Sequence, residues 1–152
     1  MVADEERDKK IALEREAVDR LRVEIFLEAP QEPPAEMVFD LDAPDDPLHG
    51  NPEGRFFHGD YGPSCYLPLS IFAGDALRGA RMRPSNIDAS AGCGEEGARI
   101  VARIRQAWPE VGITLRADSG FCREELMIWG EPNAVDSVLG LAKNERRKAE
   151  MV

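Results

Sequence analysis

The chain has 152 residues, of which 43% are hydrophobic and 32% are charged, so we expect one soluble globular domain with its own core. No apolar run approaches the ~20 residues of a membrane-spanning helix, and the charged N-terminus lacks the apolar block of a secretory signal, so we expect no membrane partner. The formal net charge of −10 argues against general nucleic-acid binding, because contacts to phosphate require local positive charge.

The N-terminal part is predicted to contain one long helix and one short strand. Residues 4–28 place apolar side chains at steps of three and four with charged residues between them, which is typical of an amphipathic helix. The stretch "APQEPPAE" (29–36) ends this helix, because proline cannot continue it. The apolar "MVFDLD" (37–42) is predicted as a strand, and residues 43–64, rich in Gly, Pro, Asn and Asp, as an irregular loop.

A hairpin and a second helix follow in the middle of the chain. The stretches "CYLPLSIFA" (65–73) and "ALRGARMRP" (76–84) are predicted as strands, and Gly74–Asp75 between them is a two-residue hairpin signal. A helix is predicted from about Glu95 to Trp108, because apolar residues recur on one side of it before a proline and a glycine end it.

The C-terminal part is predicted as a strand, a short helix and a strand. These elements are "ITLRAD" (113–118), "CREELMIWG" (122–130) and "VDSVLGLA" (135–142), and the turn "SGF" joins the first two. A hairpin followed by strand–helix–strand units indicates an α/β fold, in which a mixed sheet is flanked by helices.

Aspartates lie at the ends of two predicted strands. Asp40 and Asp42 are two residues apart, so both point to the same face of their strand, and Asp118 ends the strand 113–118. If these strands are adjacent and parallel, Asp42 and Asp118 meet at the carboxyl ends, where reactive groups gather in open α/β sheets. Two converging carboxylates repel unless a cation lies between them, and Mg²⁺ or Mn²⁺ takes such oxygen ligands. The residues alone leave open the alternative that each aspartate is a turn residue or a helix cap.

Arginines gather in the region from Arg78 to Arg123, which contains no lysine. A planar guanidinium can bind a phosphate through two parallel hydrogen bonds, so this region is the candidate surface for DNA. The residues that we expect to contact DNA are Arg81, Arg83, Arg116 and Arg123. The alternative is that these arginines lie on solvated faces of helices and strands and have no ligand.

Three blocks of the sequence carry a family resemblance. They are "DLDAPDDPLHGNPEGRFFHGDYG" (40–62), "CYLPLSIFAGDALRGARMRPSNIDASAG" (65–92) and "LRADSGFCREELM" (115–127). In this order and spacing they resemble the catalytic domain of bacterial insertion-sequence transposases of the DDE type, insertion-sequence group thirteen-eighty. The resemblance begins at about Glu16. It implies an RNase-H-like fold, cleavage of transposon ends by metal-assisted hydrolysis, joining of those ends to target DNA, and a transposase homodimer as a partner state.

The same resemblance implies which residues hold the metal. The family uses two aspartates and a glutamate with Mg²⁺ or Mn²⁺; its first aspartate matches Asp42, with Asp40 as a second candidate, and its second matches Asp118. Two residues depart from the family pattern beside these positions. Pro44 stands where the family has a threonine, and Ala117 stands where it has a glycine before the second aspartate.

In the family the third acid lies on a later helix, after an insertion. The resemblance leads us to expect that this region is missing here and that the catalytic domain is truncated. In this interpretation residues 1–36 form an N-terminal helix with a proline-rich linker, and residues 37–152 form a partial RNase-H-like domain that is incomplete at its C-terminus. Glu124 and Glu125 follow Asp118 too closely to match the third acid by motif. We therefore expect a transposase fragment that is inactive alone. The alternative is a non-catalytic DNA-binding or dimerising remnant that modulates an intact transposase.

The remaining conspicuous side chains favour structural roles. Trp108 and Trp129 lie at helical positions among aliphatic residues, which predicts core packing, and His49 and His58 lie in the predicted loop. The three cysteines are widely spaced without a Cys-x-x-Cys pair, which predicts neither a disulfide framework nor a zinc site and favours a reducing cytoplasm.

Overall fold

The main sheet has the mixed character that the sequence predicts. The computed structural model describes residues 14–30, 32–48, 56–57 and 64–142, and within them a five-stranded sheet has the order β6-β5-β1-β7-β8. The strands are β1 (Glu36–Asp42), β5 (Leu69–Ala73), β6 (Ala76–Arg81), β7 (Gly112–Ala117) and β8 (Val135–Leu139). The hairpin β5–β6 is antiparallel and pairs with one edge of β1, whereas β7 and β8 run parallel to β1 on its other edge. This arrangement confirms the predicted α/β, RNase-H-like class.

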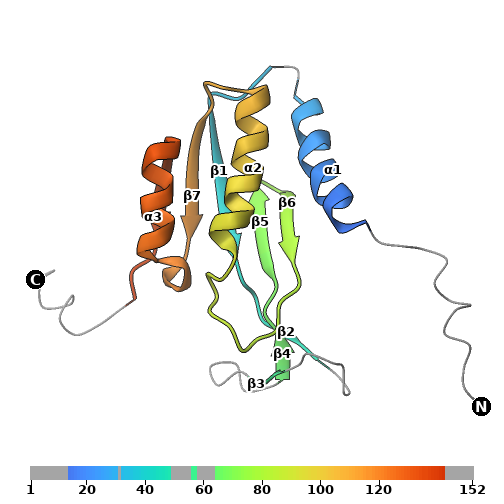
Figure 1. Cartoon of the computed structure of the whole chain (residues 1–152), viewed down its shortest axis with the longest axis vertical. Coiled ribbons are helices and arrows are strands. Elements are labelled where there is room, and N and C mark those ends of the chain that lie inside the picture. Colours follow the sequence, from blue (N-terminus) through green and yellow to red (C-terminus); the bar gives the residue numbers. More distant parts are fainter. Residues whose placement is uncertain (1–13, 31, 49–55, 58–63, 143–152) are drawn as a thin grey trace, which may run out of the picture.

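Helices lie in front of this sheet in the view of Figure 1. In the described part of the chain they are α1 (Arg15–Glu28), α2 (Cys93–Ala107) and α3 (Glu124–Gly130), with short 3-10 turns η1 (Ser119–Phe121) and η2 (Glu131–Asn133). Residues along the central strand β1 alternate between exposed or half-exposed and buried positions, as expected when one face of a sheet is packed and the other is open. No helix among the described residues is long and apolar enough to cross a membrane.

The core lies between the sheet and the helices. Phe39, Ile71 and Leu115 from the sheet and Ile104 from α2 are almost completely buried there. Trp108 belongs to the same core and Trp129 packs against it, which confirms that both tryptophans have packing roles. Burial of such large side chains is the main favourable contribution to the stability of a domain of this size.

Helix α1 packs against the hairpin and α2. Its Val23 is fully buried in the common core. The Phe26 ring meets Trp108 edge-on at 5.6 Å between ring centroids, and the Arg78 guanidinium lies 4.0 Å from the Phe26 centroid. The predicted helix over residues 4–28 is therefore present from Arg15 onward, and its earlier part lies outside the described residues.

The segment between β1 and β5 differs from its prediction. Instead of an irregular loop, the described residues form a second, three-stranded sheet of order β2-β4-β3, with β2 (Asp46–Pro47), β3 (Phe56–Phe57) and β4 (Ser64–Tyr66). The predicted strand 65–73 is consequently divided at Leu67–Pro68. Pro68 has no N–H for a sheet hydrogen bond, so the chain leaves the small sheet after β4 and enters the main sheet at β5.

The other predicted elements agree with the structure apart from their ends. The β5–β6 hairpin closes through Gly74–Asp75, where Gly74 has a φ of 58° that favours glycine. Helix α2 begins at Cys93, slightly before the predicted Glu95, and β6 ends before the predicted Pro84. The expected incompleteness of the fold at its C-terminal end concerns residues beyond the described part.

Candidate metal and DNA site

The two predicted metal-binding aspartates lie at the ends of neighbouring parallel strands. Strands β1 and β7 pair in register, with Leu41 opposite Ala117, and Asp42 and Asp118 are the residues that follow this pair. Both aspartates are exposed. The predicted adjacency and parallel direction of the two strands are therefore confirmed. The sheet brings Asp42 and Asp118 to the same end, where charged groups of an open α/β sheet meet solvent.

The Asp118 side chain is oriented by the turn that follows it. Its Oδ1 accepts a hydrogen bond of 2.8 Å from the Gly120 N–H, so Asp118 caps the 3-10 turn η1. A Cβ at position 120 would lie 3.0 Å from this oxygen and 3.4 Å from the Ala89 Cβ, so a glycine allows this close approach. The bond engages one carboxylate oxygen of Asp118 and leaves Oδ2 without a hydrogen-bond partner among the described residues.

Asp40 is committed to an ion pair. It lies on the open face of the sheet beside Arg116 of β7, whose Nε and Nη2 both donate to the carboxylate, the second over 2.8 Å. The hydrogen bond from Arg116 lowers the pKa of Asp40, and the same bond raises the pKa of Arg116. A carboxylate already neutralised by a guanidinium is a weaker metal ligand than a free one, so Asp42 fits the metal role better than Asp40.

All four predicted DNA-binding arginines have partners within the fold, and Arg81 and Arg83 are the two that are held by more than one residue of other elements. The Arg81 guanidinium donates to Asp19 of α1 and, over 2.7 Å, to Glu96 of α2. Arg83 is 8% exposed and donates to three backbone carbonyls, those of Leu67, Ala89 and Ala91. Because its guanidinium is buried and spans three acceptors, Arg83 fixes a loop instead of presenting a free face to DNA.

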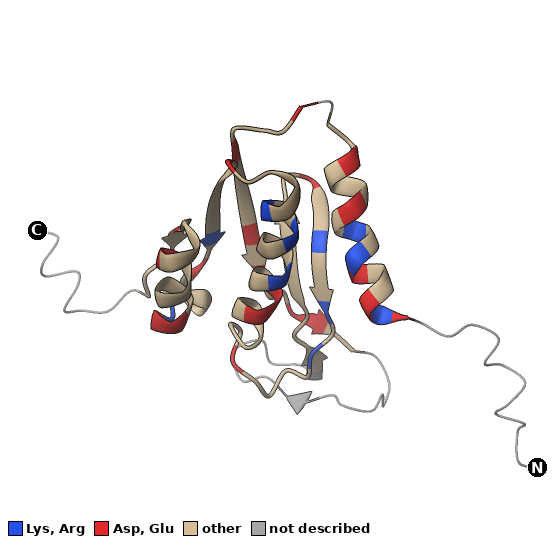
Figure 2. Cartoon of the chain, turned by 45° about the horizontal axis from the view of Figure 1, so that its top comes forward, with Lys and Arg blue, Asp and Glu red and all other residues tan. Residues whose placement is uncertain are grey.

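Figure 2 shows why this region is not a free basic surface. Red and blue segments alternate along α1, whereas β6 carries only blue segments and α2 is red at its start and blue further along. Charges are paired between these elements, as in the ion pair of Arg81 on β6 with Asp19 on α1. Arg103 of α2, for example, binds Glu24 of α1 through two hydrogen bonds of 2.6 Å each. Several of these arginines therefore form partly buried ion pairs inside the fold and do not simply lie on solvated faces without a partner.

Arg123 is paired with an acid that the sequence did not single out. Its Nη2 donates to Asp88 Oδ2 over 2.6 Å, and Asp88 Oδ1 accepts from the Ser90 N–H at 2.8 Å and from the Ser90 hydroxyl. The hydrogen bonds from Ser90 and then Arg123 lower the pKa of Asp88 to about 2. The signal for the local turn was present in the sequence, since an Asp side chain in a loop often accepts a hydrogen bond from the backbone N–H two residues later, as in an Asx turn.

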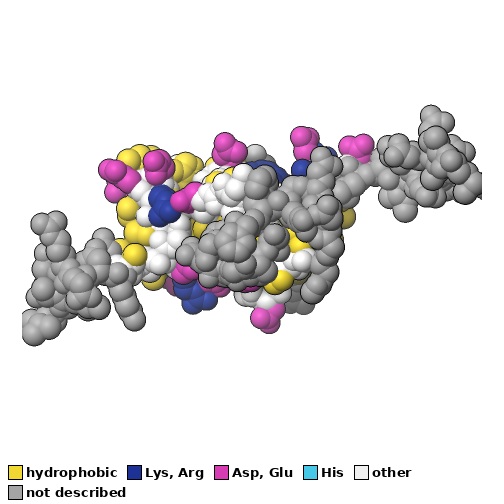
Figure 3. Space-filling view, turned by 90° about the horizontal axis from the view of Figure 1, so that it is seen from below, with side chains coloured by type: hydrophobic (Ala, Val, Ile, Leu, Met, Phe, Trp, Pro, Cys, Tyr) yellow, Lys and Arg dark blue, Asp and Glu magenta, His cyan; other side chains and the backbone are white. Residues whose placement is uncertain are grey.

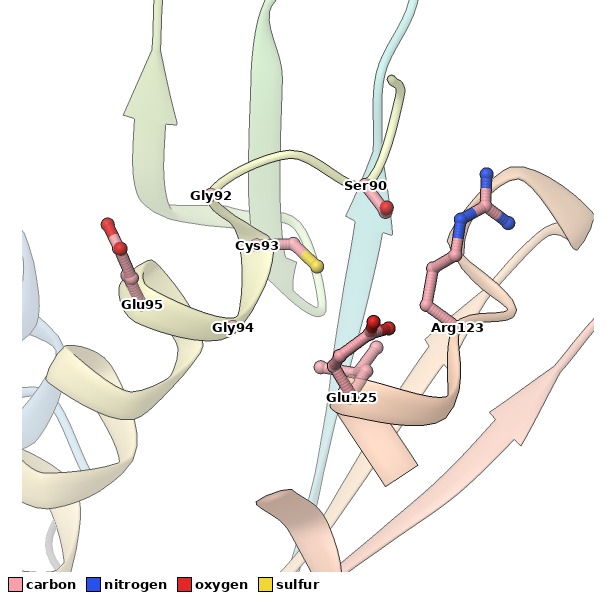
Figure 4. Close-up of a pocket in the computed structure, with 8 residues that line it drawn as sticks. Ser90, Gly92, Cys93, Gly94, Glu95, Arg123 and Glu125 are labelled. Atoms are coloured by element: carbon pink, nitrogen blue, oxygen red, sulfur yellow. The ribbon is translucent and has the colours of Figure 1, made fainter. Parts of the chain in front are cut away.

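A hollow of about 390 Å³ lies next to Asp118. Its walls come from Ala43, just after Asp42, from the turn 118–121, from residues 87–89 and from Arg123. A second hollow of about 410 Å³ lies on the other side of Arg123, at the start of α2. Figure 4 shows the side chains of Ser90, Cys93 and Glu125 around this second space. Arg123 thus borders both hollows, and the Asp118 carboxylate borders the first.

The described residues do not supply a third metal ligand by proximity. No group of three or more His, Cys, Asp or Glu side chains within the described ranges could hold a metal ion together. Glu125 lines the second hollow instead of the one beside Asp118, and His49 and His58 lie outside the described residues. Figure 3 looks onto the end where β1 and β7 terminate, and both acidic and basic side chains are visible in the part of this surface that the undescribed residues leave uncovered.

The three cysteines are free thiols, as their spacing predicts. Burial raises the pKa of the Cys93 thiol at the start of α2, so this thiol is protonated near neutral pH.

The chain has a family match and resembles several solved structures. A family model described as "Transposase DDE domain group 1" matches residues 3–152. Solved structures that resemble the chain include a piggyBac transposase synaptic complex with hairpin DNA, at 14% identity and a TM-score of 0.47, over 76% of this chain and 25% of that chain. A Mos1 transposase paired-end complex with the left transposon end matches at 10% identity and a TM-score of 0.43, over 84% of this chain and 43% of that chain. The chain thus spans less than half the length of these two transposases, and no curated protein matches it.

Proposed function

Because the chain belongs to the family of transposase DDE domains of group 1, we propose that it contributes to DNA cleavage and strand transfer with Asp42 and Asp118 as metal-holding carboxylates. One observation carries this proposal. The register of β1 and β7 pairs Leu41 with Ala117, and an exposed aspartate follows each of these residues at the same end of the sheet. Assignment to the insertion-sequence group thirteen-eighty is part of the same proposal and is supported by the quoted sequence blocks.

The donor set fits a hard divalent cation. Asp42 and one oxygen of Asp118 offer carboxylate ligands, which Mg²⁺ and Mn²⁺ prefer and supplement with water. When bound, such an ion activates the attacking oxygen and stabilises the leaving oxygen of a phosphodiester. The part of this chain is to hold the ion against the phosphate, and the Gly120 N–H helps by fixing the direction of the Asp118 carboxylate.

We propose DNA as the partner, with Arg116 and Arg123 as its accessible guanidinium contacts. The side chain of Arg116 is 61% exposed and that of Arg123 is 41% exposed, whereas Arg83 is buried. The homodimer that the resemblance implies remains a prediction, as does a cytoplasmic location.

We also infer that this chain alone cuts DNA slowly or not at all. Fixed geometry of the metal is essential for phosphodiester cleavage, and two carboxylates constrain an ion less than three. The absence of a three-ligand cluster among residues 14–30, 32–48 and 64–142 supports this inference. The same observation favours the second candidate function, a DNA-binding or dimerising module that modulates an intact transposase without catalysis.

Metal binding tests the proposal directly. Calorimetric titration with Mn²⁺ would compare the wild type with Asp42→Asn and Asp118→Asn, which keep the side-chain shape and remove one charge each. Asp75→Asn is the matched control, because Asp75 lies in the β5–β6 turn away from the site. We expect each site variant to bind Mn²⁺ about tenfold more weakly or worse, as is typical when a ligand or its immediate support is lost, and the control to match the wild type.

A cleavage assay separates the two candidate functions. The wild type would be incubated with transposon-end DNA and Mn²⁺, and cutting would be compared with that by the two site variants. Mn²⁺ binding that is unchanged in both variants would remove Asp42 and Asp118 from the site. Rapid metal-dependent cutting by the wild type would contradict the inferred inactivity and would direct attention to Glu124 and Glu125 as completing acids.

A further inference from the structure

The loop between β6 and α2 is held rigidly next to Asp118. Arg83 donates hydrogen bonds to the carbonyls of Ala89 and Ala91 over 3.0 and 2.5 Å and to that of Leu67 over 2.8 Å. A Cβ at position 120 would lie only 3.4 Å from the Ala89 Cβ, so the loop touches the turn that Asp118 caps. The position of this loop is therefore fixed relative to the proposed metal ligand.

Asp88 is oriented within that loop before any ligand arrives. Its Oδ1 receives hydrogen bonds from both the backbone N–H and the hydroxyl of Ser90, which leaves Oδ2 directed at Arg123. With a pKa of about 2, this carboxylate is ionised at every pH at which the protein would operate. An anion held by its own loop is a firm support for a long, flexible arginine side chain.

Arg123 retains free hydrogen-bond donors at the edge of the hollow. A guanidinium has five N–H groups. The described structure engages one N–H of Nη2 with Asp88 and one of Nη1 with the Cys122 carbonyl at 3.2 Å. The Arg123 side chain is 41% exposed and lines the same hollow as Asp118. The remaining N–H groups can therefore bind an anion in or beside that hollow.

From these contacts we propose that Asp88 is a positioning residue, which holds the Arg123 guanidinium beside Asp118 so that it binds a phosphate of the DNA backbone. The proposal rests on the proposed function, because it takes DNA as the ligand of the hollow. It adds a residue to the site and gives the loop 84–92 a role in orienting DNA.

The proposal predicts a change in DNA affinity that is opposite in direction to the change that net charge alone predicts. In a protein with a net charge of −10, neutralising a surface acid should strengthen binding to a polyanion slightly. If Asp88 acts by positioning Arg123, neutralising it should weaken binding instead. In Asp88→Asn the side-chain oxygen can still accept from Ser90, so the loop is preserved while the ion pair with Arg123 is lost.

The experiment measures binding of the whole chain to a fluorescein-labelled DNA duplex of mixed sequence by anisotropy at low salt. The variants are Asp88→Asn, Arg123→Gln, the double variant and the control Asp75→Asn, and thermal unfolding is recorded for each. We expect Asp88→Asn to bind about fivefold more weakly, which corresponds to one hydrogen bond of ordinary net strength. We expect the control to bind as well as the wild type or slightly better.

The double variant distinguishes positioning from an independent role. If Asp88 acts through Arg123, adding Asp88→Asn to Arg123→Gln should cause no further loss of affinity. Ser90→Ala, which removes one hydrogen bond to Asp88, should give a smaller loss in the same direction and serves as the test if Asp88→Asn unfolds.

Each outcome has a distinct meaning for the two proposals. A wild type that does not bind the duplex would contradict the DNA-binding part of the proposed function and this inference with it. A wild type that binds, together with an Asp88→Asn variant that binds equally or more tightly, would overturn the positioning role alone. Additive losses in the double variant would also overturn it.

Discussion

Replacing Arg83 by methionine separates a structural role from a DNA-binding role. The guanidinium is buried and donates to the carbonyls of Leu67, Ala89 and Ala91, which belong to two segments that meet near Asp118. Net contributions of ~1.5–3 kcal/mol are usual for hydrogen bonds to charged groups. The three bonds share one donor group, and water and the methionine side chain offset part of the loss. We therefore expect the free energy of unfolding to fall by about 3 kcal/mol, which is less than the sum.

Urea unfolding monitored by circular dichroism measures this loss, and a thermal scan should show a melting temperature lower by about 6–12 °C for a chain of this size. Arg20→Gln is the control, because Arg20 is an exposed residue of α1, and it should change the unfolding free energy by less than about 0.5 kcal/mol. A loss below about 1 kcal/mol for Arg83→Met would refute the structural reasoning. Weaker DNA binding with an unchanged free energy of unfolding would show instead that Arg83 contacts DNA.

Two further predictions concern the surroundings of Asp118. A Cβ at position 140 would lie 2.8 Å from the Ser119 nitrogen and 3.0 Å from the Asp118 carbonyl carbon, so Gly140→Ala should destabilise the fold by about 1–3 kcal/mol and weaken Mn²⁺ binding. Gly94→Ala in α2, where a Cβ meets nothing within 4 Å, is the control, and equal stability of the two variants would contradict the predicted clash. The lowered pKa of Asp88 stabilises the fold above its unfolded pKa of ~3.9, and this contribution is lost as the pH falls toward about 2. The stability difference between the wild type and Asp88→Asn, measured by urea unfolding, should therefore shrink over that range, and a difference independent of pH would show that ionised Asp88 is not its source.

The strand ends that carry the aspartates could be predicted because the signal is local. An apolar run followed by an acid marks β1 and β7, and their parallel pairing is the usual outcome of a hairpin followed by strand–helix–strand units. The small sheet of β2, β3 and β4 was missed because its strands have two or three residues, too few for a period of two to be visible.

The partners of the arginines could not be predicted, because they meet only after folding. Arg116 and Asp40 are 76 positions apart, and Arg103 and Glu24 are 79 apart. Sequence spacing indicates pairs within one helix or across a short turn, and it carries no signal for contacts of this range. An arginine-rich region therefore has the same composition whether its charges face DNA or bind acids inside the fold.

The pairing of arginines with acids inside the fold affects how the chain could recognise DNA. Asp19 and Glu96 are buried, and they are matched by Arg81 and by arginines of α1 and α2, so these charges cancel locally and exert little long-range attraction. The more accessible guanidinium groups of Arg116 and Arg123 each have a carboxylate partner as well. With a net charge of −10, long-range steering of DNA toward this surface is weak. Affinity must then come from guanidinium groups that are already oriented when the phosphate arrives, which is the role that Asp88 serves for Arg123.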